Sequence, residues 1–476
     1  MAESFVLAGL TRRRQTPRQE RTGSRRLRSQ HWLAQNMCIE RLEFTTLELV
    51  EIDHPLLAAI RPRYVPRVAD SQLQRALRTA PVVLIEGPRA CGKTWTGGYA
   101  ARSAVLLDAQ EATALTSAMA RRLLIEGAKP KLLDEYHLAP ELWNPVRRAA
   151  DELAQPGQFI LTGSAVPPDS TTRHTGAGRV RRVRMRPMSL AESGESTAQV
   201  SLGALFDSDE AAAAAPADEP DMFELACRGG WPALIHLGGT EAQPALRDYL
   251  DDLCRADIEH VDSARRDPAG VARLLESLSR NIATSASLRV LADDMAQVRP
   301  ADPRTVAAYL SALERLFIVE NLTPWPVDLR SRAHLVSAPK RYLVDPSLAV
   351  AALRSSRPRL LADPRGFGNL FEALVMRDLR IYADASDARL FYYRDNTGLE
   401  VDAIIERSDG RWIAVEIKLG GGAGPDKAAA ALLRLRDKVD LAKTGEPAKL
   451  IVVTAGGYAH ERHDGVAVVP ITTLCA

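Results

Sequence analysis

The chain has 476 residues, more than one hydrophobic core usually organises, so we expect about two or three domains. Apolar residues make up 46% and charged residues 26% of the sequence, the balance of an ordinary soluble globular protein. No apolar run approaches about eighteen residues, which disfavours a membrane span and a secretion signal. The five cysteines form no Cys-x-x-Cys pair, which excludes a zinc ribbon and a disulfide framework. We therefore expect a cytoplasmic protein with free thiols and no membrane partner.

The N-terminal end differs in charge from the rest of the chain. The formal net charge is +2, yet residues 1–36 contain eight arginines and two acidic residues, so the remaining chain is slightly acidic. We expect residues 1–55 to form a disordered or flexible tail, with Met37 as an alternative start; a nucleic-acid-binding arm is the competing interpretation. The folded part is not strongly basic, so contact with DNA would need a local patch.

Residues 64–200 show the pattern of an α/β domain with a parallel sheet. Short continuous apolar runs alternate there with helical stretches, as in strands that are buried on both faces. These runs are Val82–Ile85, Val105–Leu107, Leu132–Leu133 and Phe159–Leu161. Residues 201–221 follow, and their acidic, alanine-rich composition predicts a linker or an exposed insertion.

Residues 222–355 are mostly helical in pattern. Asp302 and Pro303 form a good helix start, and apolar residues recur at helical spacing from Val306 to Phe317. A shorter helix, Leu288–Met295, precedes this one, and two extended runs follow it. Two helices followed by a pair of strands is the layout of a winged helix, so this middle region is predicted to be winged-helix-like. The second helix either reads DNA or is simply an amphipathic packing helix.

Residues 366–476 show a different order of elements. The pattern predicts a helix, three strands, a second helix and a further strand, an αβββαβ order. The predicted elements are the helix Asn369–Tyr382, the strands Leu390–Arg394, Leu399–Glu406 and Trp412–Lys418, a helix over 425–441, and strands Leu450–Val453 and Val466–Ile471.

A phosphate-binding loop is the most specific motif in the chain. It fits the pattern G-x-x-x-x-G-K-[ST] and lies between a predicted strand and a predicted helix, which is the context that the mechanism requires. Its residues are Gly87, Pro88, Arg89, Ala90, Cys91, Gly92, Lys93 and Thr94. Backbone N–H groups of such a loop surround the phosphates of ATP, the lysine neutralises phosphate oxygens and the threonine hydroxyl holds Mg²⁺. With only nine lysines among 62 basic residues, the use of one here is informative.

Polar residues end the next two predicted strands. Asp134 and Glu135 follow an apolar run, an arrangement in which Asp134 orders Mg²⁺ and Glu135 polarises the attacking water. Thr162 and Ser164 end a further strand, where they are positioned to sense the terminal phosphate. An acidic pair after a strand is often only a solvated turn, but its place downstream of a phosphate-binding loop favours the catalytic interpretation.

The C-terminal region contains a second set of chemically informative residues. Glu416 and Lys418 share one face of a predicted strand, and a hairpin would bring Asp402 of the preceding strand close to them. Close carboxylates are costly unless a cation lies between them, so Mg²⁺ bound there would activate water for attack on a phosphodiester, with Lys418 positioning the nucleophile and Glu372 completing the metal shell. The competing interpretation is a fold whose acidic residues serve packing or weak ion binding.

A set of short motifs resembles a family of prokaryotic AAA+ ATPases. The motifs are Leu133–Tyr136, Pro140–Leu142, Leu161–Ser164, Gly178–Arg179, Pro187–Leu190, Gly229–Pro232, Asp257–Ile258, Lys340–Asp345 and Gly368–Glu372. The resemblance covers residues 64 to 455. It implies a P-loop AAA+ core, a winged-helix-like middle and a C-terminal domain of uncharacterised function similar to PD-(D/E)xK nucleases.

The resemblance also implies roles for individual residues. It suggests a sensor role for Thr162 or Ser164 and an arginine-finger role for Arg179, although Arg179 belongs to a run of arginines that also fits a solvated strand. His137 stands where the family often carries glutamine, so its role is open. The acidic stretch over 207–220 looks like an insertion relative to the family.

The sequence as a whole predicts a multidomain α/β ATPase that uses ATP and Mg²⁺. One hypothesis is a DNA-processing enzyme in which the nucleotide state repositions a C-terminal nuclease. The other is an ATP-gated DNA-binding or regulatory module whose nuclease-like domain is catalytically inactive. DNA and further copies of the chain are the expected macromolecular partners, and metal-dependent DNA cleavage would separate the two hypotheses.

Overall fold

The computed structural model describes residues 54–106, 122–165, 178–207, 211–216, 218–261, 264, 266–296, 301–327, 338–420 and 423–476. Most of the predicted N-terminal tail, including Met37, lies outside these residues. Helix α2 (Pro55–Ile60) already begins at the last residue of that predicted tail, and the His54 side chain accepts a hydrogen bond from the backbone of Leu56. Among the described residues, no helix is both long and apolar enough to cross a membrane.

The first domain is built on a five-stranded sheet in the order β2-β3-β4-β1-β5, and all four neighbouring pairs are parallel. The strands are β1 (Val82–Glu86), β2 (Ser103–Leu106), β3 (Lys131–Asp134), β4 (Phe159–Gly163) and β5 (Val180–Arg184). The parallel sheet predicted from the short apolar runs is therefore confirmed. Leu107, the last residue of one of those runs, lies outside the described residues.

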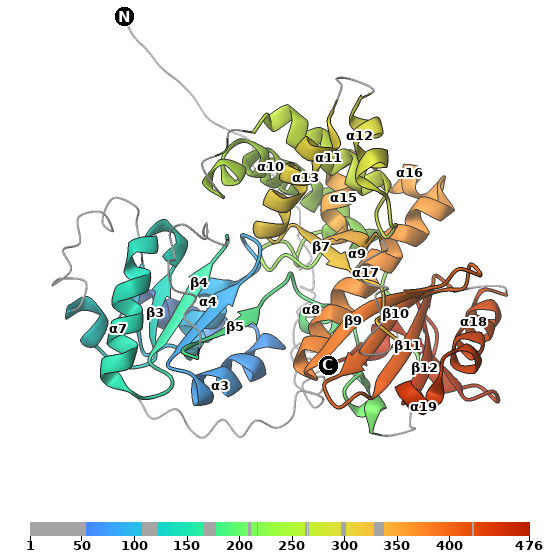
Figure 1. The fold of residues 1–476 in the computed structure, drawn as a ribbon, viewed down its shortest axis with the longest axis horizontal. Helices are drawn as coiled ribbons and strands as arrows, with labels where there is room; N and C mark the ends of the chain where they lie inside the picture. Colours follow the sequence, from blue (N-terminus) through green and yellow to red (C-terminus); the bar gives the residue numbers. More distant parts are fainter. Residues whose placement is uncertain are drawn as a thin grey trace, which may run out of the picture.

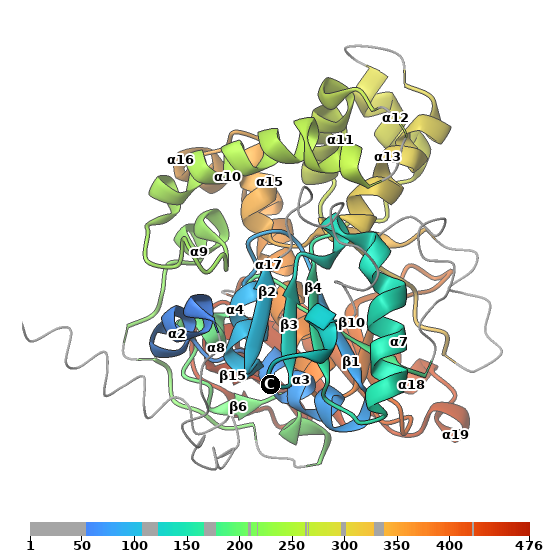
Figure 2. The same ribbon diagram turned by 90° about the vertical axis from the view of Figure 1, so that its left-hand side faces the viewer.

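Both faces of this sheet are covered by helices, which explains why its strands read as continuous apolar runs. Val83 and Ile85 pack in one cluster with residues of α2 and α3 (Ala69–Thr79), on the side where α4 (Lys93–Ala100) also lies. Val82 and Leu84 point the other way, into a cluster with α7 (Trp143–Leu153). Figure 2 shows α7 on one side of the strands and α2 with α4 on the other.

The middle region is mostly helical and contains one pair of strands (Figure 1). Its helices are α9 (Met222–Arg228), α10 (Gly239–Arg255), α11 (Pro268–Arg280), α12 (Leu288–Ala296), α13 (Pro303–Arg315), α15 (Pro346–Ala352) and α16 (Arg357–Leu361). Between α13 and α15, strands β7 (Val319–Leu322) and β8 (Lys340–Leu343) pair in antiparallel fashion. Asp302 caps α13 by accepting a hydrogen bond from the backbone N–H of Arg304 at 2.7 Å. Two helices followed by a strand pair are therefore present, while their likeness to a winged helix stays a prediction.

The C-terminal region holds a six-stranded mixed sheet in the order β13-β14-β12-β11-β10-β9. Its main elements are α17 (Pro364–Ala385), β9 (Ala388–Arg394), β10 (Glu400–Arg407), β11 (Trp412–Lys418), α18 (Gly424–Lys438), α19 (Leu441–Thr444), β12 (Lys449–Thr454), β13 (His460–Glu461) and β14 (Val466–Pro470). Strands β9, β10 and β11 are antiparallel, whereas β11, β12 and β14 are parallel. Helix, three strands, helix and strand thus follow one another in the order expected from the sequence, which by itself does not establish a nuclease.

Parts of the segment predicted as an acidic linker pack against the C-terminal region. Strand β6 (Val200–Ser201) pairs with β15 (Leu474–Cys475) at the end of the chain. Asp207 forms ion pairs with Arg407 and Arg411, and the Glu219 carboxylate accepts a hydrogen bond from the backbone of Gly457 at 2.7 Å. Asp207 and Glu219 therefore bind basic side chains and a backbone N–H group of the C-terminal region, so these parts of the segment are not a free connection.

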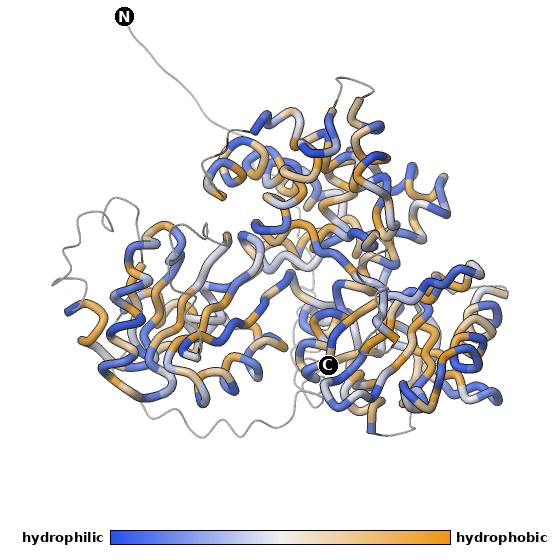
Figure 3. Tube along the Cα trace, in the orientation of Figure 1, coloured by the Kyte–Doolittle hydropathy of each residue, from blue (hydrophilic) through white to orange (hydrophobic). Residues whose placement is uncertain are grey.

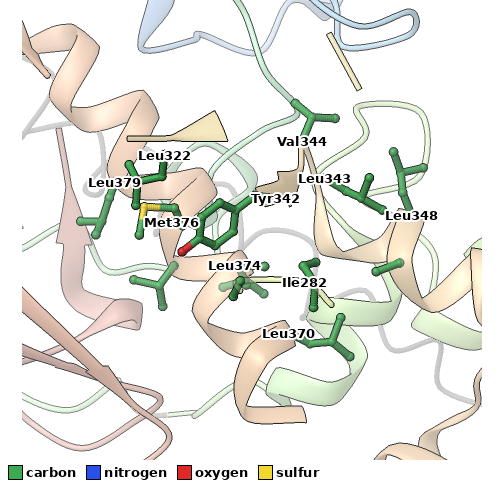
Figure 4. Close-up of a cluster of buried hydrophobic side chains, with 14 of the residues drawn as sticks. Ile282, Leu322, Tyr342, Leu343, Val344, Leu348, Leu370, Leu374, Met376 and Leu379 are labelled. Carbon is green, nitrogen blue, oxygen red and sulfur yellow. The ribbon is translucent and has the colours of Figure 1, made fainter. Parts of the chain in front are cut away.

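The middle and C-terminal regions share one hydrophobic core. Figure 4 shows side chains of α17 against the strand β8 and the residues that follow it. The cluster includes Tyr342, Leu343, Val344, Leu348, Leu370, Leu374, Met376 and Leu379. Figure 3 shows where apolar and polar residues lie in the whole molecule: apolar residues follow the strands, and hydrophilic residues lie on the outer sides of the helices. Moving the C-terminal sheet against the middle region would therefore expose apolar surface from both.

Candidate functional site

The phosphate-binding loop joins the end of β1 to the start of α4. Gly92 has a positive φ of 104°, which favours glycine, and a Cβ at Gly87 would lie 2.2 Å from the backbone oxygen of Met185. The loop backbone is thus tightly held where a phosphate would approach it. Lys93, the first residue of α4, is 4% exposed, and its Nζ donates a hydrogen bond to the Pro88 oxygen at 2.9 Å. Loop, lysine and helix N-terminus together fit a nucleotide phosphate.

The buried side chain of Arg67 binds the backbone of this loop. This role was not predicted from the sequence. Its Nη1 donates to the oxygen of Cys91 and its Nη2 to the oxygen of Arg186, each at 2.8 Å. Its Nε lies 3.0 Å from the Glu192 carboxylate, and both side chains are buried. A lone arginine in an arginine-rich sequence gives no signal of such a role, because its partners lie 24 to 125 residues away.

Asp134 lies where the phosphate-binding loop and the ends of two strands meet. Thr94 donates a hydrogen bond to one oxygen of Asp134 at 3.1 Å, and Thr162 donates to the other at 2.6 Å. Burial raises the pKa of Asp134 against the opposing effect of these hydrogen bonds. The structure therefore brings together Thr94, Asp134 and Thr162, as expected, in a group whose hydroxyl and carboxylate oxygens suit Mg²⁺.

Glu135 is held beside them in a left-handed backbone conformation, with a φ of 53°. Its backbone N–H donates to Thr162 at 2.9 Å, and the Ser164 hydroxyl donates to its carboxylate at 3.4 Å. Burial would raise the pKa of Glu135, but the His137 ring, 3.2 Å from its carboxylate, and the charge of Lys93 outweigh burial and lower it. Glu135 is thus an ionised acceptor, and His137 is its neighbour on the same turn.

A pocket of about 390 Å³ opens beside these residues, a volume within the usual range for small-molecule sites. The P-loop domain contributes Arg89, Glu135, His137, Leu138, Ser164 and Ala165, and the middle region contributes Tyr249, Leu253, Ala256, Asp257 and Leu316. Arg89 of the loop lies 3.2 Å from Asp257, and the Tyr249 hydroxyl donates to the Arg89 oxygen at 3.5 Å. A nucleotide bound to the loop would therefore lie next to both parts of the chain.

Arg179 lies away from this pocket. Its backbone oxygen accepts a hydrogen bond from Val82, at the start of β1, whereas the phosphate-binding loop follows the other end of that strand. Its side chain pairs with Asp151, and both are well exposed. Arg179 therefore cannot serve the nucleotide site of its own chain in this arrangement. An arginine-finger role toward a second copy stays a prediction, as does the homo-oligomer that it requires.

The C-terminal residues singled out in the sequence do come together on β10 and β11. Asp402 accepts a hydrogen bond from the backbone N–H of Ile417 at 2.9 Å. The Nζ of Lys418 lies 3.4 Å from that same Asp402 oxygen and 2.7 Å from the Glu416 carboxylate. The hairpin register, in which Ala403 faces Val415, accounts for this arrangement.

Lys340 enters the same cluster from β8 of the middle region. Its Nζ lies 2.8 Å from Glu400, 3.3 Å from Glu372 and 3.5 Å from Asp402. The Tyr342 hydroxyl donates to Glu372 at 2.7 Å. The sequence placed Lys340 only within a family motif, since nothing in its local pattern indicates a partner on another sheet.

The electrostatics of this acidic cluster reflect burial and crowding. Burial, followed by the charge of Asp402, raises the pKa of Glu416 to about 8 and that of Glu372 to about 7. Burial would lower the pKa of Lys340, but Glu372 and Asp402 outweigh it and raise that pKa above its usual value. Ammonium groups, rather than a preformed space for an ion, balance the carboxylates here.

The expected metal ligands Asp402, Glu416 and Glu372 are therefore near one another without forming a ready metal site. Within the described ranges, no three His, Cys, Asp or Glu side chains are arranged to hold a metal ion. Lysine nitrogens contact all three of these carboxylates. The metal role assigned to them from the sequence stays a prediction that requires some rearrangement.

Three family models match consecutive parts of the chain. Residues 79–194 match a model described as "AAA domain", residues 219–359 match domain of unknown function DUF8612, and residues 367–474 match domain of unknown function DUF4143. The first match covers the sheet, the phosphate-binding loop and the Asp134–Thr162 contact. The first domain is a P-loop ATPase domain of the AAA type.

Two curated proteins resemble most of the chain. The uncharacterized proteins Rv2008c of Mycobacterium tuberculosis and Mb2031c of Mycobacterium bovis are each 28% identical over 415 residues, which is 85% of this chain and 83% of theirs. Among solved structures, Thermotoga maritima RuvB aligns with a TM-score of 0.27 and 16% identity, covering 56% of this chain and 93% of RuvB. Aeropyrum pernix ORC2 aligns with a TM-score of 0.29 and 14% identity, covering 63% of this chain and 91% of ORC2.

Proposed function

We propose that the chain is an ATP-hydrolysing regulatory protein that binds DNA, with the nucleotide state of its P-loop domain controlling the middle and C-terminal regions. The observation that carries the proposal is the pocket beside the phosphate-binding loop. The walls of this pocket come from the P-loop domain and from the middle region, mainly helix α10 and the residues that follow it. A bound nucleotide would therefore contact both regions directly.

Each residue of the nucleotide site has a distinct part in this proposal. Lys93 and the loop backbone would hold the phosphates of ATP, and Thr94 with Asp134 would hold Mg²⁺. When bound, Mg²⁺ supplies positive charge that offsets the charge developing on the phosphates. Glu135, ionised and fixed by His137 and Ser164, would orient the attacking water. Thr162 links the two acidic residues by accepting from Glu135 and donating to Asp134.

The DNA part of the proposal rests on helix α13. It follows α12, precedes the β7–β8 pair, and turns Val306, Leu310 and Leu313 inward while Arg304 is exposed and Arg315 is partly exposed. Neutralising both arginines should weaken DNA binding about tenfold and reduce its salt dependence, since fewer phosphate contacts release fewer counterions. Fluorescence anisotropy of labelled duplex DNA at several salt concentrations measures both effects.

Arg434→Ala on α18 is the control for this experiment, because Arg434 is exposed but lies outside the middle region. Unchanged DNA affinity in the Arg304→Ala/Arg315→Ala variant would contradict a DNA site on α13. A loss of binding on deletion of residues 1–36 alone would instead assign the contact to the arginine-rich end.

The placement of Asp402, Glu416 and Lys418 on neighbouring strands raises a second candidate function, metal-dependent DNA cleavage, which can be tested directly. We expect no cleavage, because lysine nitrogens contact the carboxylates that would bind the metal. Supercoiled plasmid incubated with the full chain, with Mg²⁺ and ATP varied separately, should therefore stay intact. Metal-dependent nicking that Glu416→Gln abolishes and Lys418→Ala reduces would establish the nuclease instead, since the first variant removes a ligand and the second a group that orients the nucleophile.

A further inference from the structure

Lys340 is buried in an unusual environment for a lysine. Its side chain is 4% exposed, and its ammonium group contacts carboxylates from two different elements, Glu372 on α17 and Glu400 with Asp402 on β10. Burying an ammonium group is unfavourable unless charged partners compensate for the lost hydration. Three carboxylates within 3.5 Å provide that compensation.

The carboxylates of Asp402 and Glu372 each have further partners in this cluster. Asp402 has one oxygen near Lys340, and the other accepts from Ile417 and lies near Lys418. Glu372 has Lys340 and Tyr342 as its partners. Buried carboxylates at this spacing repel one another unless a cation lies among them, and the ammonium group of Lys340 is the cation that contacts both Asp402 and Glu372.

Divalent metal ions bind in proteins to the same kind of oxygen set. Mg²⁺ and Mn²⁺ prefer carboxylate oxygens, and two or more carboxylates from neighbouring elements are their usual protein ligands. Lys340 comes from β8, outside the αβββαβ elements that carry Glu372, Asp402 and Glu416. Removing its amine would leave those three carboxyl groups with one positive charge fewer to balance them, and they would rearrange around a divalent ion.

We propose that Lys340 is a built-in cation that takes the place of a divalent metal between Glu372 and Asp402. The wild-type cluster then excludes Mg²⁺ and Mn²⁺, and removal of this one amine converts it into a divalent-metal site. The inference concerns metal binding alone, so it stands or falls independently of ATP hydrolysis and of any contact with DNA.

Titration of the full chain with Mn²⁺ in the absence of nucleotide tests the proposal. Calorimetry and Mn²⁺ electron paramagnetic resonance should show a saturable site in Lys340→Met with an affinity about tenfold or more above that of wild type. The double variant Lys340→Met/Glu416→Gln should lose the gain. Asp134→Asn in every protein of the series removes metal bound at the phosphate-binding loop from the comparison.

Lys449→Met is the matched control. The Lys449 side chain is also 4% exposed and pairs with an acidic residue, Glu461, but it lies outside the cluster. It should gain no Mn²⁺ site. If Lys340→Met unfolds without metal, added Mn²⁺ should restore the fold as followed by circular dichroism, because the metal replaces the missing cation.

Two results would overturn the inference. One is wild-type protein that binds Mn²⁺ as tightly as Lys340→Met and loses that binding in Glu416→Gln. The other is a Lys340→Met variant, folded or refolding, in which Mn²⁺ binds no better than in wild type and stabilises nothing. A failure of the chain to bind DNA would contradict the proposed function but would not change the expected result of these Mn²⁺ titrations.

Discussion

Lys93→Ala should lower ATP affinity by about 100-fold or more. The Lys93 amine is buried at the start of α4, where it donates a hydrogen bond to the loop backbone and its charge acts on Asp134 and Glu135 at the end of β3. A charge-assisted contact to phosphate in such a place contributes about 3 kcal/mol, which corresponds to that loss. Titration with a fluorescent ATP analogue measures the affinity, and circular dichroism checks that the variant is folded.

Glu135→Gln is the matched variant, because it changes a residue of the pocket beside the phosphate-binding loop but leaves the loop and Lys93 intact. ATP affinity should stay within about twofold, whereas the hydrolysis rate should fall by about 100-fold or more, since a glutamine cannot act on the attacking water as an ionised carboxylate does. Unchanged ATP affinity in Lys93→Ala would exclude the loop as the nucleotide site. Unchanged hydrolysis in Glu135→Gln would move the catalytic role to another residue.

The sequence was most informative where function depends on neighbours along the chain. The phosphate-binding loop could be predicted because its glycines, lysine and threonine form one short segment between a strand and a helix. Asp134 and Thr162 could be paired with it because parallel strands present their carboxyl ends at one edge of the sheet, and Thr162 indeed donates to Asp134. The sequence left the role of His137 open, and the structure shows that its ring lies beside the Glu135 carboxylate in the same turn.

Residues whose role depends on distant partners could not be predicted in this way. Arg67 contacts Glu192, which lies 125 residues further along the chain, and Lys340 contacts Asp402, which lies 62 residues further. A local pattern specifies which face of a strand is buried, but not which other element packs against it. Arg179 shows a related limit, since the motif that suggests an arginine finger does not show that the parallel pairing of β5 with β1 places this residue at the end of the strand away from its own chain's phosphate-binding loop.

A buried ion-pair junction connects the three parts of the chain. Glu320 of β7 in the middle region lies 3.0 Å from Arg186, which follows β5 of the P-loop domain, and 3.6 Å from Arg380 on α17 of the C-terminal region. Arg184, the last residue of β5, lies 3.5 Å from the same carboxylate. Arg67 donates hydrogen bonds both to the Arg186 backbone and to the phosphate-binding loop. A single side chain therefore connects this junction to the nucleotide site.

Glu320→Gln should therefore be one of the most destabilising single changes in the chain. It leaves the positive charges of Arg184, Arg186 and Arg380 buried without their shared partner, and breaking a buried ion pair on one side costs about 3–5 kcal/mol. Thermal unfolding at neutral pH should show a clear fall in Tm. Glu276→Gln is the control, because that carboxylate is 43% exposed and pairs with Arg280 one helical turn away on the surface.

The pH dependence of stability provides the sharper test of the junction. Burial would raise the pKa of Glu320, but the charges of Arg186, Arg380 and Arg184 outweigh it and lower the pKa to about 2, against an ordinary value of 4.5. A depressed carboxylate pKa stabilises the fold by about 3 kcal/mol above pH 4.5, and that contribution disappears as the pH falls from 4.5 to 2. Wild type should thus lose stability over this interval faster than Glu320→Gln, so that their melting temperatures converge in acid. Parallel curves from pH 7 down to pH 3 would mean that Glu320 has the same pKa in the folded and the unfolded chain, so the three arginines would not stabilise its ionised form.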